Sequence, residues 1–128
     1  MSKSDKRLHA LLVDDNLLVL KSLGMIFDVL GWSSVQVEDS EQALRQLEKQ
    51  QFDLVILDLR MPETDGISLC RTIRENVRYK DIIIFIHSGY MNDQTLAEAE
   101  RAGANAVLHK PMGLNEIRSQ LKSVGLEK

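Results

Sequence analysis

A chain of 128 residues is long enough to bury the core of one domain without metal or disulfide staples, and too short for two independent domains. Its apolar and charged fractions, 44% and 27%, are typical of a packed globular protein and exclude a disordered or fibrous chain. A formal net charge of -3 provides no basic surface for a polyanion, so we expect no direct nucleic-acid binding by this segment.

Cysteine content and hydropathy predict a cytoplasmic location. Cys70 is the only cysteine, so no internal disulfide can form, and a reduced cytosol fits best. No apolar run approaches the length of a membrane span or a signal sequence. We therefore expect one domain over residues 1–128 that does not bind a membrane, with a flexible polar N-terminus over residues 1–7.

Short apolar runs alternate five times with longer segments of helical period. This alternation predicts strands near residues 8–13, 33–37, 53–57, 82–86 and 105–109, with helices in the intervals and at the C-terminus. Three helical segments carry apolar stripes, and each stripe predicts one buried face. The stripes are Leu20, Leu23, Phe27 and Leu30; Leu69, Ile73 and Val77; and Leu114, Ile117, Leu121 and Val124.

The residues around these stripes also predict where helices begin and end. Gly31 and Gly103 follow two helical segments, where a helix commonly ends in a left-handed residue. Asp39 or Ser40 is the candidate N-cap of the second helix, and Asn92 or Asp93 that of the fourth.

Strands joined by helices run parallel, and a parallel sheet is covered on both faces, so its central strands are apolar throughout. Residues 10–13, 54–57 and 82–86 fit that description, whereas residues 33–37 and 105–109 contain polar positions suited to edge strands. The sequence therefore predicts an α/β fold with a doubly wound, five-stranded parallel sheet in the flavodoxin-like order 2-1-3-4-5.

Polar residues follow four of the predicted strands, at the edge where such sheets bind ligands. They are Asp14 and Asp15, then Asp58, then Ser88, and finally Lys110. Three crowded carboxylates should raise a pKa or hold a cation, and hard oxygen ligands suit Mg²⁺, with Mn²⁺ as an alternative. A carboxylate can also accept a phosphoryl group, so we expect Asp58 to be the nucleophile, assisted by the metal, Lys110 and Ser88.

These residues carry a family resemblance that covers nearly the whole chain. The segments Val13-Asp14-Asp15-Asn16, Leu57-Asp58-Leu59-Arg60-Met61-Pro62, Asp65-Gly66, Ser88-Gly89, Gly103-Ala104 and Lys110-Pro111 occur in order at predicted strand ends. Together they resemble the receiver domain of two-component response regulators.

The resemblance implies a phosphorelay protein rather than a conventional enzyme. It implies that Asp15 and Asp58 bind Mg²⁺ directly, that Asp14 helps through water, and that the Arg60 backbone carbonyl is a further ligand. A sensor histidine kinase, a phosphotransfer protein or acetyl phosphate is the expected phosphoryl donor to Asp58. Ser88 is then expected to turn toward the phosphoryl group and switch the surface of helix four, strand five and helix five.

Further implications concern the backbone and the partners. The resemblance implies a cis Lys110-Pro111 bond, an output domain or downstream protein as partner, and phosphorylation-dependent dimerisation. Val107 departs from the family pattern, because it stands where receivers commonly carry an aromatic switch residue. We therefore expect the loop from Ser88 to Asn92 to relay the signal, with Tyr90 as a substitute ring.

Three other functions share parts of this pattern. A flavodoxin-like electron carrier would need a phosphate-cradling loop after the first strand, where Asp14 and Asp15 would repel FMN phosphate. An aspartyl phosphatase would need a second acid two residues after Asp58, where Arg60 stands. A degenerate receiver that only binds proteins would have lost acids or the lysine, and all five polar residues are present here.

Several residues have plainer structural explanations. Cys70 lies near an apolar stripe and is expected to be an inert core residue. His9, His87 and His109 show no metal-ligand spacing, so all three are expected to be structural or exposed. The basic run Arg71, Arg74, Arg78 and Lys80 is expected to be a solvated helix face.

Overall fold

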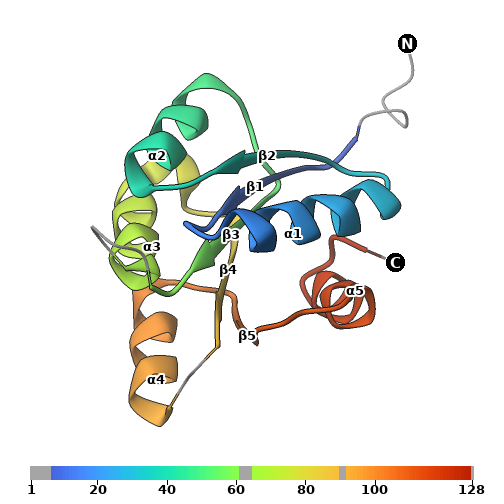
Figure 1. Cartoon of the computed structure of the whole chain (residues 1–128). Coiled ribbons are helices and arrows are strands. Elements are labelled where there is room, and N and C mark those ends of the chain that lie inside the picture. Colours follow the sequence, from blue (N-terminus) through green and yellow to red (C-terminus); the bar gives the residue numbers. More distant parts are fainter. Residues whose placement is uncertain (1–6, 61–64, 90–91, 128) are drawn as a thin grey trace.

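The computed structural model describes residues 7–60, 65–89 and 92–127 (Figure 1). Strands and α-helices alternate five times in this part of the chain, and a short 3₁₀ turn, η2, precedes the fourth strand. The elements are β1 (His9–Val13), α1 (Leu17–Val29), β2 (Ser33–Val37), α2 (Ser40–Lys49), β3 (Leu54–Asp58), α3 (Gly66–Glu75), η2 (Val77–Tyr79), β4 (Ile83–Ser88), α4 (Asp93–Ala102), β5 (Ala106–His109) and α5 (Leu114–Ser123).

All strand pairs are parallel, and the order is β2-β1-β3-β4-β5. Helices α1 and α5 cover one face of the sheet, and α2, α3 and α4 cover the other (Figure 1). The predicted doubly wound fold is therefore confirmed. Because the crossovers change face between β1 and β3, these two central strands flank the switch point at which such sheets bind ligands.

The hydrophobic core lies on both faces of β1 and β3. Leu12, Leu54 and Ile56 face α1 and α5, whereas Leu11 and Val55 face the opposite helices, and all five are 0% exposed. The outer strands β2 and β5 retain half-buried and exposed positions, as predicted for edges. No helix in the described residues combines the length and hydropathy that crossing a bilayer requires.

The predicted helix boundaries are largely confirmed. Asp39 caps α2 by accepting the Gln42 N–H at 2.8 Å, and Asn92 caps α4 by accepting the Thr95 N–H at 2.8 Å. Gly31 and Gly103 have φ values of 84° and 104°, in the left-handed region that favours glycine.

The apolar stripes are confirmed with one exception. Leu20, Leu23, Phe27, Leu69, Ile73, Ile117 and Leu121 are buried. Val77 was predicted to extend the buried face of α3, and this is wrong: its side chain is 74% exposed. The helix ends before Val77 because Asn76 adopts an extended conformation and accepts the Arg78 N–H through its side chain.

The prediction that the basic run forms a solvated helix face is wrong for Arg74. Its guanidinium donates to the carbonyls of Gly103 at 3.0 Å and Tyr79 at 2.9 Å, and to the Asn105 side chain at 2.9 Å. The same Asn105 oxygen accepts the N–H of Ile84 in β4. Arg74 thus ties the connection before β4 to the connection before β5.

We predict that Arg74→Ala lowers the free energy of unfolding by about 2 kcal/mol, because several acceptors lose a charged donor. The matched control is Arg71→Ala on the same helix, which removes an exposed side chain and should change stability by less than about 0.5 kcal/mol. Urea denaturation of both variants measures the difference, and equal losses would contradict the bracing role of Arg74.

Candidate functional site

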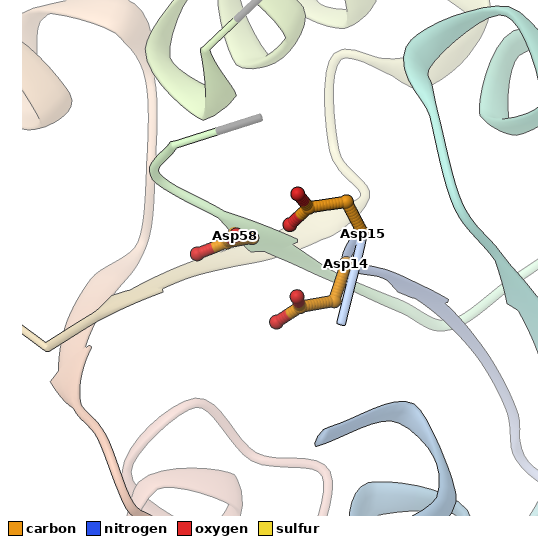
Figure 2. Close-up of side chains that lie close together, drawn as sticks. All are labelled: Asp14, Asp15 and Asp58. Carbon is orange, nitrogen blue, oxygen red and sulfur yellow. The ribbon is translucent and has the colours of Figure 1, made fainter. Parts of the chain in front are cut away.

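The predicted site residues meet at the carboxyl edge of the sheet. Asp14 directly follows β1, Asp58 is the last residue of β3, and Lys110 directly follows β5. The side chains of Asp14, Asp15 and Asp58 lie together, and one carboxylate oxygen from each falls within 4.8 Å of the others (Figure 2). The three acids differ in burial: Asp14 is 0% exposed, Asp58 is 5% exposed, and Asp15 is exposed.

The turn between β1 and α1 holds Asp14 in place. Asn16 is the N-cap of α1, and its side chain accepts the N–H groups of Leu18 at 2.9 Å and Val19 at 3.3 Å. The Asn16 backbone N–H donates to Asp14 Oδ1 at 2.8 Å. Because Asn16 supplies the cap, Asp14 and Asp15 are free of the helix-start role that an isolated acid pair would commonly have.

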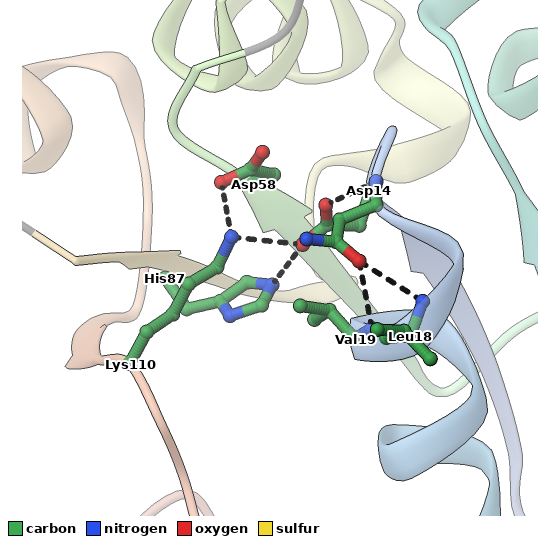
Figure 3. Close-up of polar contacts among 7 residues, drawn as sticks. Asp14, Leu18, Val19, Asp58, His87 and Lys110 are labelled. Atoms are coloured by element: carbon green, nitrogen blue, oxygen red, sulfur yellow. Dashed lines mark hydrogen bonds and ion pairs between the residues drawn. The ribbon is translucent and has the colours of Figure 1, made fainter.

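Lys110 joins the two buried acids. Its Nζ lies 3.0 Å from Asp58 Oδ1 and 3.0 Å from Asp14 Oδ2 (Figure 3). The backbone N–H of Lys110 donates to the Ser88 carbonyl at 2.8 Å, which fixes the residue beside the end of β4. The Lys110-Pro111 peptide bond is cis, as the family resemblance implied.

The two buried carboxylates are electrostatically unequal. Burial opposes ionisation of Asp14, but its polar contacts with His87, Asn16 and Lys110 outweigh this effect and lower the pKa of Asp14. Burial raises the pKa of Asp58, and the nearby Asp14 charge adds to this effect while Lys110 opposes it. For Lys110, burial is outweighed by the two acids, which raise its pKa. The pKa values of the two acids are thus pushed apart, so Asp58 is the more basic.

Gly66 brings the start of α3 close to Asp58. A Cβ atom at this position would collide with the Asp58 carbonyl oxygen, so the close approach requires glycine. The Gly66 N–H donates to the Leu59 carbonyl at 2.8 Å, and Asp65 caps α3 by accepting the Ser68 N–H at 2.7 Å. The Asp65-Gly66 pair therefore shapes the backbone beside the acid cluster.

Ser88 and Arg60 are the remaining predicted site residues that the structure describes. Ser88 ends β4 and is 4% exposed, and its register partner in β5 is His109. Arg60 is exposed and lies two residues after β3, where it forms an isolated bridge with Asp65. Met61, Pro62 and Tyr90, which the sequence analysis also singled out, lie outside the described residues.

His87 is a site residue that was not predicted from the sequence. Its ring is 1% exposed, and its Nε2 lies 3.3 Å from Asp14 Oδ2 (Figure 3). Strand register could have indicated this position, because His87 pairs with Asp58 and follows Phe85 on the face that α1 and α5 cover. The other histidines are placed as predicted: His109 is exposed, and His9 is half-buried and hydrogen-bonded to Ser33 and Gln50.

Cys70 is not part of this site. It is 0% exposed in α3, and its Sγ contacts the Ala102 carbonyl oxygen at 3.5 Å. Burial raises the pKa of this thiol, which disfavours the reactive thiolate. The prediction that it is a core residue is confirmed.

The acid cluster fits a small divalent cation. Carboxylate oxygens within 4.8 Å of one another can converge on one Mg²⁺ after small movements. The Asp14 oxygens already face Asn16, Lys110 and His87, which leaves Asp15 and Asp58 as the better direct ligands.

Comparison with known proteins agrees with this geometry. A family model described as the response regulator receiver domain matches residues 10–122. The chain is 30% identical over 115 residues to sporulation initiation phosphotransferase F of Bacillus subtilis, covering 88% of this chain and 89% of that protein. It is 38% identical over 109 residues to the transcriptional regulatory protein GlrR of Escherichia coli, covering 85% of this chain.

Several relatives are much longer proteins. The chain spans 24% of the length of GlrR. It spans 16% of the CAI-1 autoinducer sensor kinase/phosphatase CqsS of Vibrio cholerae, to which it is 32% identical over 112 residues.

Solved structures support the same assignment. A putative response regulator from Chloroflexus aurantiacus is 28% identical, with a TM-score of 0.87, over 93% of this chain and 98% of that one. The chemotaxis protein CheY4 of Vibrio cholerae, 24% identical with a TM-score of 0.89 over 93% of this chain and 99% of that one, has the same fold. The chain belongs to the family of response regulator receiver domains of two-component signalling.

Proposed function

We propose that Asp58 of this receiver domain accepts a phosphoryl group from a phosphohistidine on a sensor kinase or phosphotransfer protein, or from acetyl phosphate. A phosphoacceptor role is general for the family, and relatives of this chain include a sensor kinase and a phosphotransferase. An Asp58 oxygen forms a bond to phosphorus as the bond from phosphorus to the donor breaks. From phosphohistidine the P–N bond breaks and the leaving imidazole takes up a proton, whereas from acetyl phosphate the P–O bond breaks and acetate leaves. Later hydrolysis of the acyl phosphate restores the carboxylate.

Burial and basicity favour Asp58 over its neighbours. The Asp14 side chain is 0% exposed, so an incoming phosphoryl group has no access to it, whereas the Asp58 side chain is 7% exposed. Burial raises the pKa of Asp58, and a more basic carboxylate is a better nucleophile. The contact of Lys110 with Asp58 Oδ1 is the observation that carries the proposal, because it puts an ammonium where phosphoryl charge would accumulate.

We further propose that Mg²⁺, or Mn²⁺ in its place, is held by the Asp15 and Asp58 carboxylates and the Arg60 backbone carbonyl, with Asp14 acting through water. Bound there, the ion would neutralise charge on the phosphoryl oxygens. Lys110 would contribute its ammonium to the same oxygens, and Ser88 would donate its hydroxyl from the end of β4. The convergence of Asp14, Asp15 and Asp58 supports this assignment.

The output surface is proposed to comprise α4, β5 and α5. Val107 is half-buried in β5 and, together with Leu96 of α4, lines a shallow groove of about 410 Å³. A valine has no ring to rotate between buried and exposed positions, so we propose that the segment after Ser88 relays phosphorylation to this surface. Tyr90 lies outside the described residues, and its role as a substitute ring stays a prediction, as does phosphorylation-dependent dimerisation.

A degenerate receiver that binds partners without phosphorylation is the alternative. Burying two carboxylates and an ammonium together costs folding free energy. A domain that only binds partners would gain nothing from that cost. The intact contacts of Lys110 with Asp14 and Asp58 therefore favour the phosphoacceptor.

We predict that acetyl phosphate and Mg²⁺ add one phosphoryl group to the wild-type protein and none to Asp58→Asn, as measured by intact-mass spectrometry. The amide of the variant cannot form an acyl phosphate, so the loss should be complete. Asp81→Asn is the matched control, because Asp81 is an exposed acid before β4, at the opposite edge of the sheet. Equal phosphate uptake by wild type and Asp58→Asn would contradict the assignment of the phosphoacceptor.

We also predict opposite stability effects for the two buried acids in the absence of divalent cations. Asp58→Asn should raise the midpoint of thermal unfolding, because burial disfavours the Asp58 charge and raises its pKa. Asp14→Asn should lower the midpoint, because the partners of Asp14 favour its charge and lower its pKa. Calorimetry of both variants measures the two shifts, and shifts of the same sign would contradict the electrostatic inequality of the acids.

A related prediction concerns the metal. At ten times its dissociation constant, Mg²⁺ should stabilise the wild type by about 1.4 kcal/mol and stabilise Asp15→Asn much less. The control is Glu38→Gln, which changes an exposed acid just after β2. Thermal unfolding with and without Mg²⁺ measures the increments, and an equal increment in Asp15→Asn would exclude Asp15 as a ligand.

A further inference from the structure

Asp14 has two donors directed at the same carboxylate oxygen. Lys110 Nζ lies 3.0 Å from Asp14 Oδ2, and His87 Nε2 approaches that oxygen at 3.3 Å (Figure 3). Lys110 forms an ion pair with this oxygen, but neither Asp14 Oδ2 nor His87 Nε2 has a hydrogen bond of ordinary geometry. His87 Nε2 is thus a donor that lies next to Asp14 Oδ2 while Lys110 is paired with the same oxygen.

The side of the ring that faces Asp14 must carry a proton. A bare imidazole nitrogen would point its lone pair at the lone pairs of the carboxylate, which is repulsive, so Nε2–H is the form that fits this contact. A neutral ring can carry this proton as well as a charged one. The role of His87 therefore needs no change in its protonation.

The backbone of His87 is fixed by strand pairing, and its ring is buried. Its carbonyl accepts the Leu59 N–H at 2.9 Å, and it lies opposite Asp58 in the register of β3 and β4. His87 and Lys110 are among the residues that line a groove of about 360 Å³ between α1 and the connection from β5 to α5. The Lys110 side chain is 24% exposed and has room to turn, whereas His87 needs only a small shift to shorten its contact with Asp14 Oδ2.

The proposed function creates a difficulty that His87 can resolve. If Lys110 turns to a phosphoryl group on Asp58, it withdraws its charge from Asp14 Oδ2, and the loss of a charged donor by a buried carboxylate oxygen is unfavourable. The nearest other donor to this oxygen that the structure shows is His87 Nε2. Closing that contact from 3.3 Å to an ordinary hydrogen-bond length would satisfy the oxygen.

We propose that His87 is a positioning residue that takes over Asp14 Oδ2 when Lys110 turns to the phosphoryl group. This inference rests on the proposed function and adds to it a residue of this chain that acts through Asp14 without touching the phosphoryl group. In the unphosphorylated arrangement His87 shares Asp14 Oδ2 with Lys110, and in the phosphorylated arrangement it would be the side chain that remains beside that oxygen.

A matched pair of variants tests this role. His87→Gln keeps an N–H donor near the position of Nε2, whereas His87→Leu removes it and fills a similar volume. Beryllofluoride with Mg²⁺ serves as the phosphoryl mimic, and its dissociation constant is measured by titration calorimetry. We expect about tenfold weaker binding in His87→Leu, as loss of one hydrogen bond to a charged group predicts, and a change of less than about twofold in His87→Gln.

Two further measurements separate positioning from a merely structural role. Urea denaturation without ligand should give similar stabilities for the two variants, because Lys110 still holds Asp14 in both. In the wild type, ¹⁵N NMR of the imidazole should show the Nε2–H resonance shifting downfield when beryllofluoride binds, as the hydrogen bond shortens.

Different results would overturn the role of His87 and the proposed function. Equal beryllofluoride affinity in wild type and His87→Leu, or equal weakening in the Leu and Gln variants, would overturn the role of His87 alone. An unprotonated Nε2 in the bound state would do the same. Failure of the wild type to bind beryllofluoride would overturn the proposed function and this inference with it.

Discussion

The rest of the site depends on two buried carboxylates that lie within contact distance of one ammonium. Asp14 and Asp58 come from adjacent central strands, and at 0% and 5% exposure neither is well solvated by water. The repulsion between them is offset by Lys110, which reaches from beyond β5, two strands away from β3, to lie 3.0 Å from both acids. The parallel order of the sheet makes this possible, because all three strands end at the same edge.

The unequal environments of the acids give them different roles. Asp14 is anchored by Asn16, Lys110 and His87, so its charge is well stabilised and its pKa is lowered. Asp58 contacts Lys110 and retains slight access to solvent, and burial raises its pKa, which suits the phosphoacceptor role proposed for it. In the proposed function, the Lys110 ammonium moves from Asp14 to the phosphoryl group. His87 then donates to Asp14 and lowers the free-energy cost of this move.

The fold and the acid cluster were predictable because they depend on patterns local in sequence. Unbroken apolar runs such as residues 54–57 identify central strands, and a parallel sheet then brings residues such as Asp58 and Lys110 to one edge. His87 was missed because its contact with Asp14 depends on strand register and side-chain direction. Arg74 was missed because its partners are mainly backbone carbonyls, which leave no sequence signal. Val77 was misplaced because the helix ends through the local hydrogen bond of Asn76.

The proposed function requires that the acid cluster bind a metal beside Asp58 while Lys110 shifts to a group attached to Asp58. A crystal structure of the chain with Mg²⁺ and beryllofluoride tests it most directly. We expect beryllofluoride bound to Asp58 through beryllium, the ion bound by the Asp15 and Asp58 carboxylates, and the Lys110 ammonium within hydrogen-bond distance of fluoride. An ion bound away from these acids, or a Lys110 ammonium still lying between Asp14 and Asp58 beside bound beryllofluoride, would contradict it.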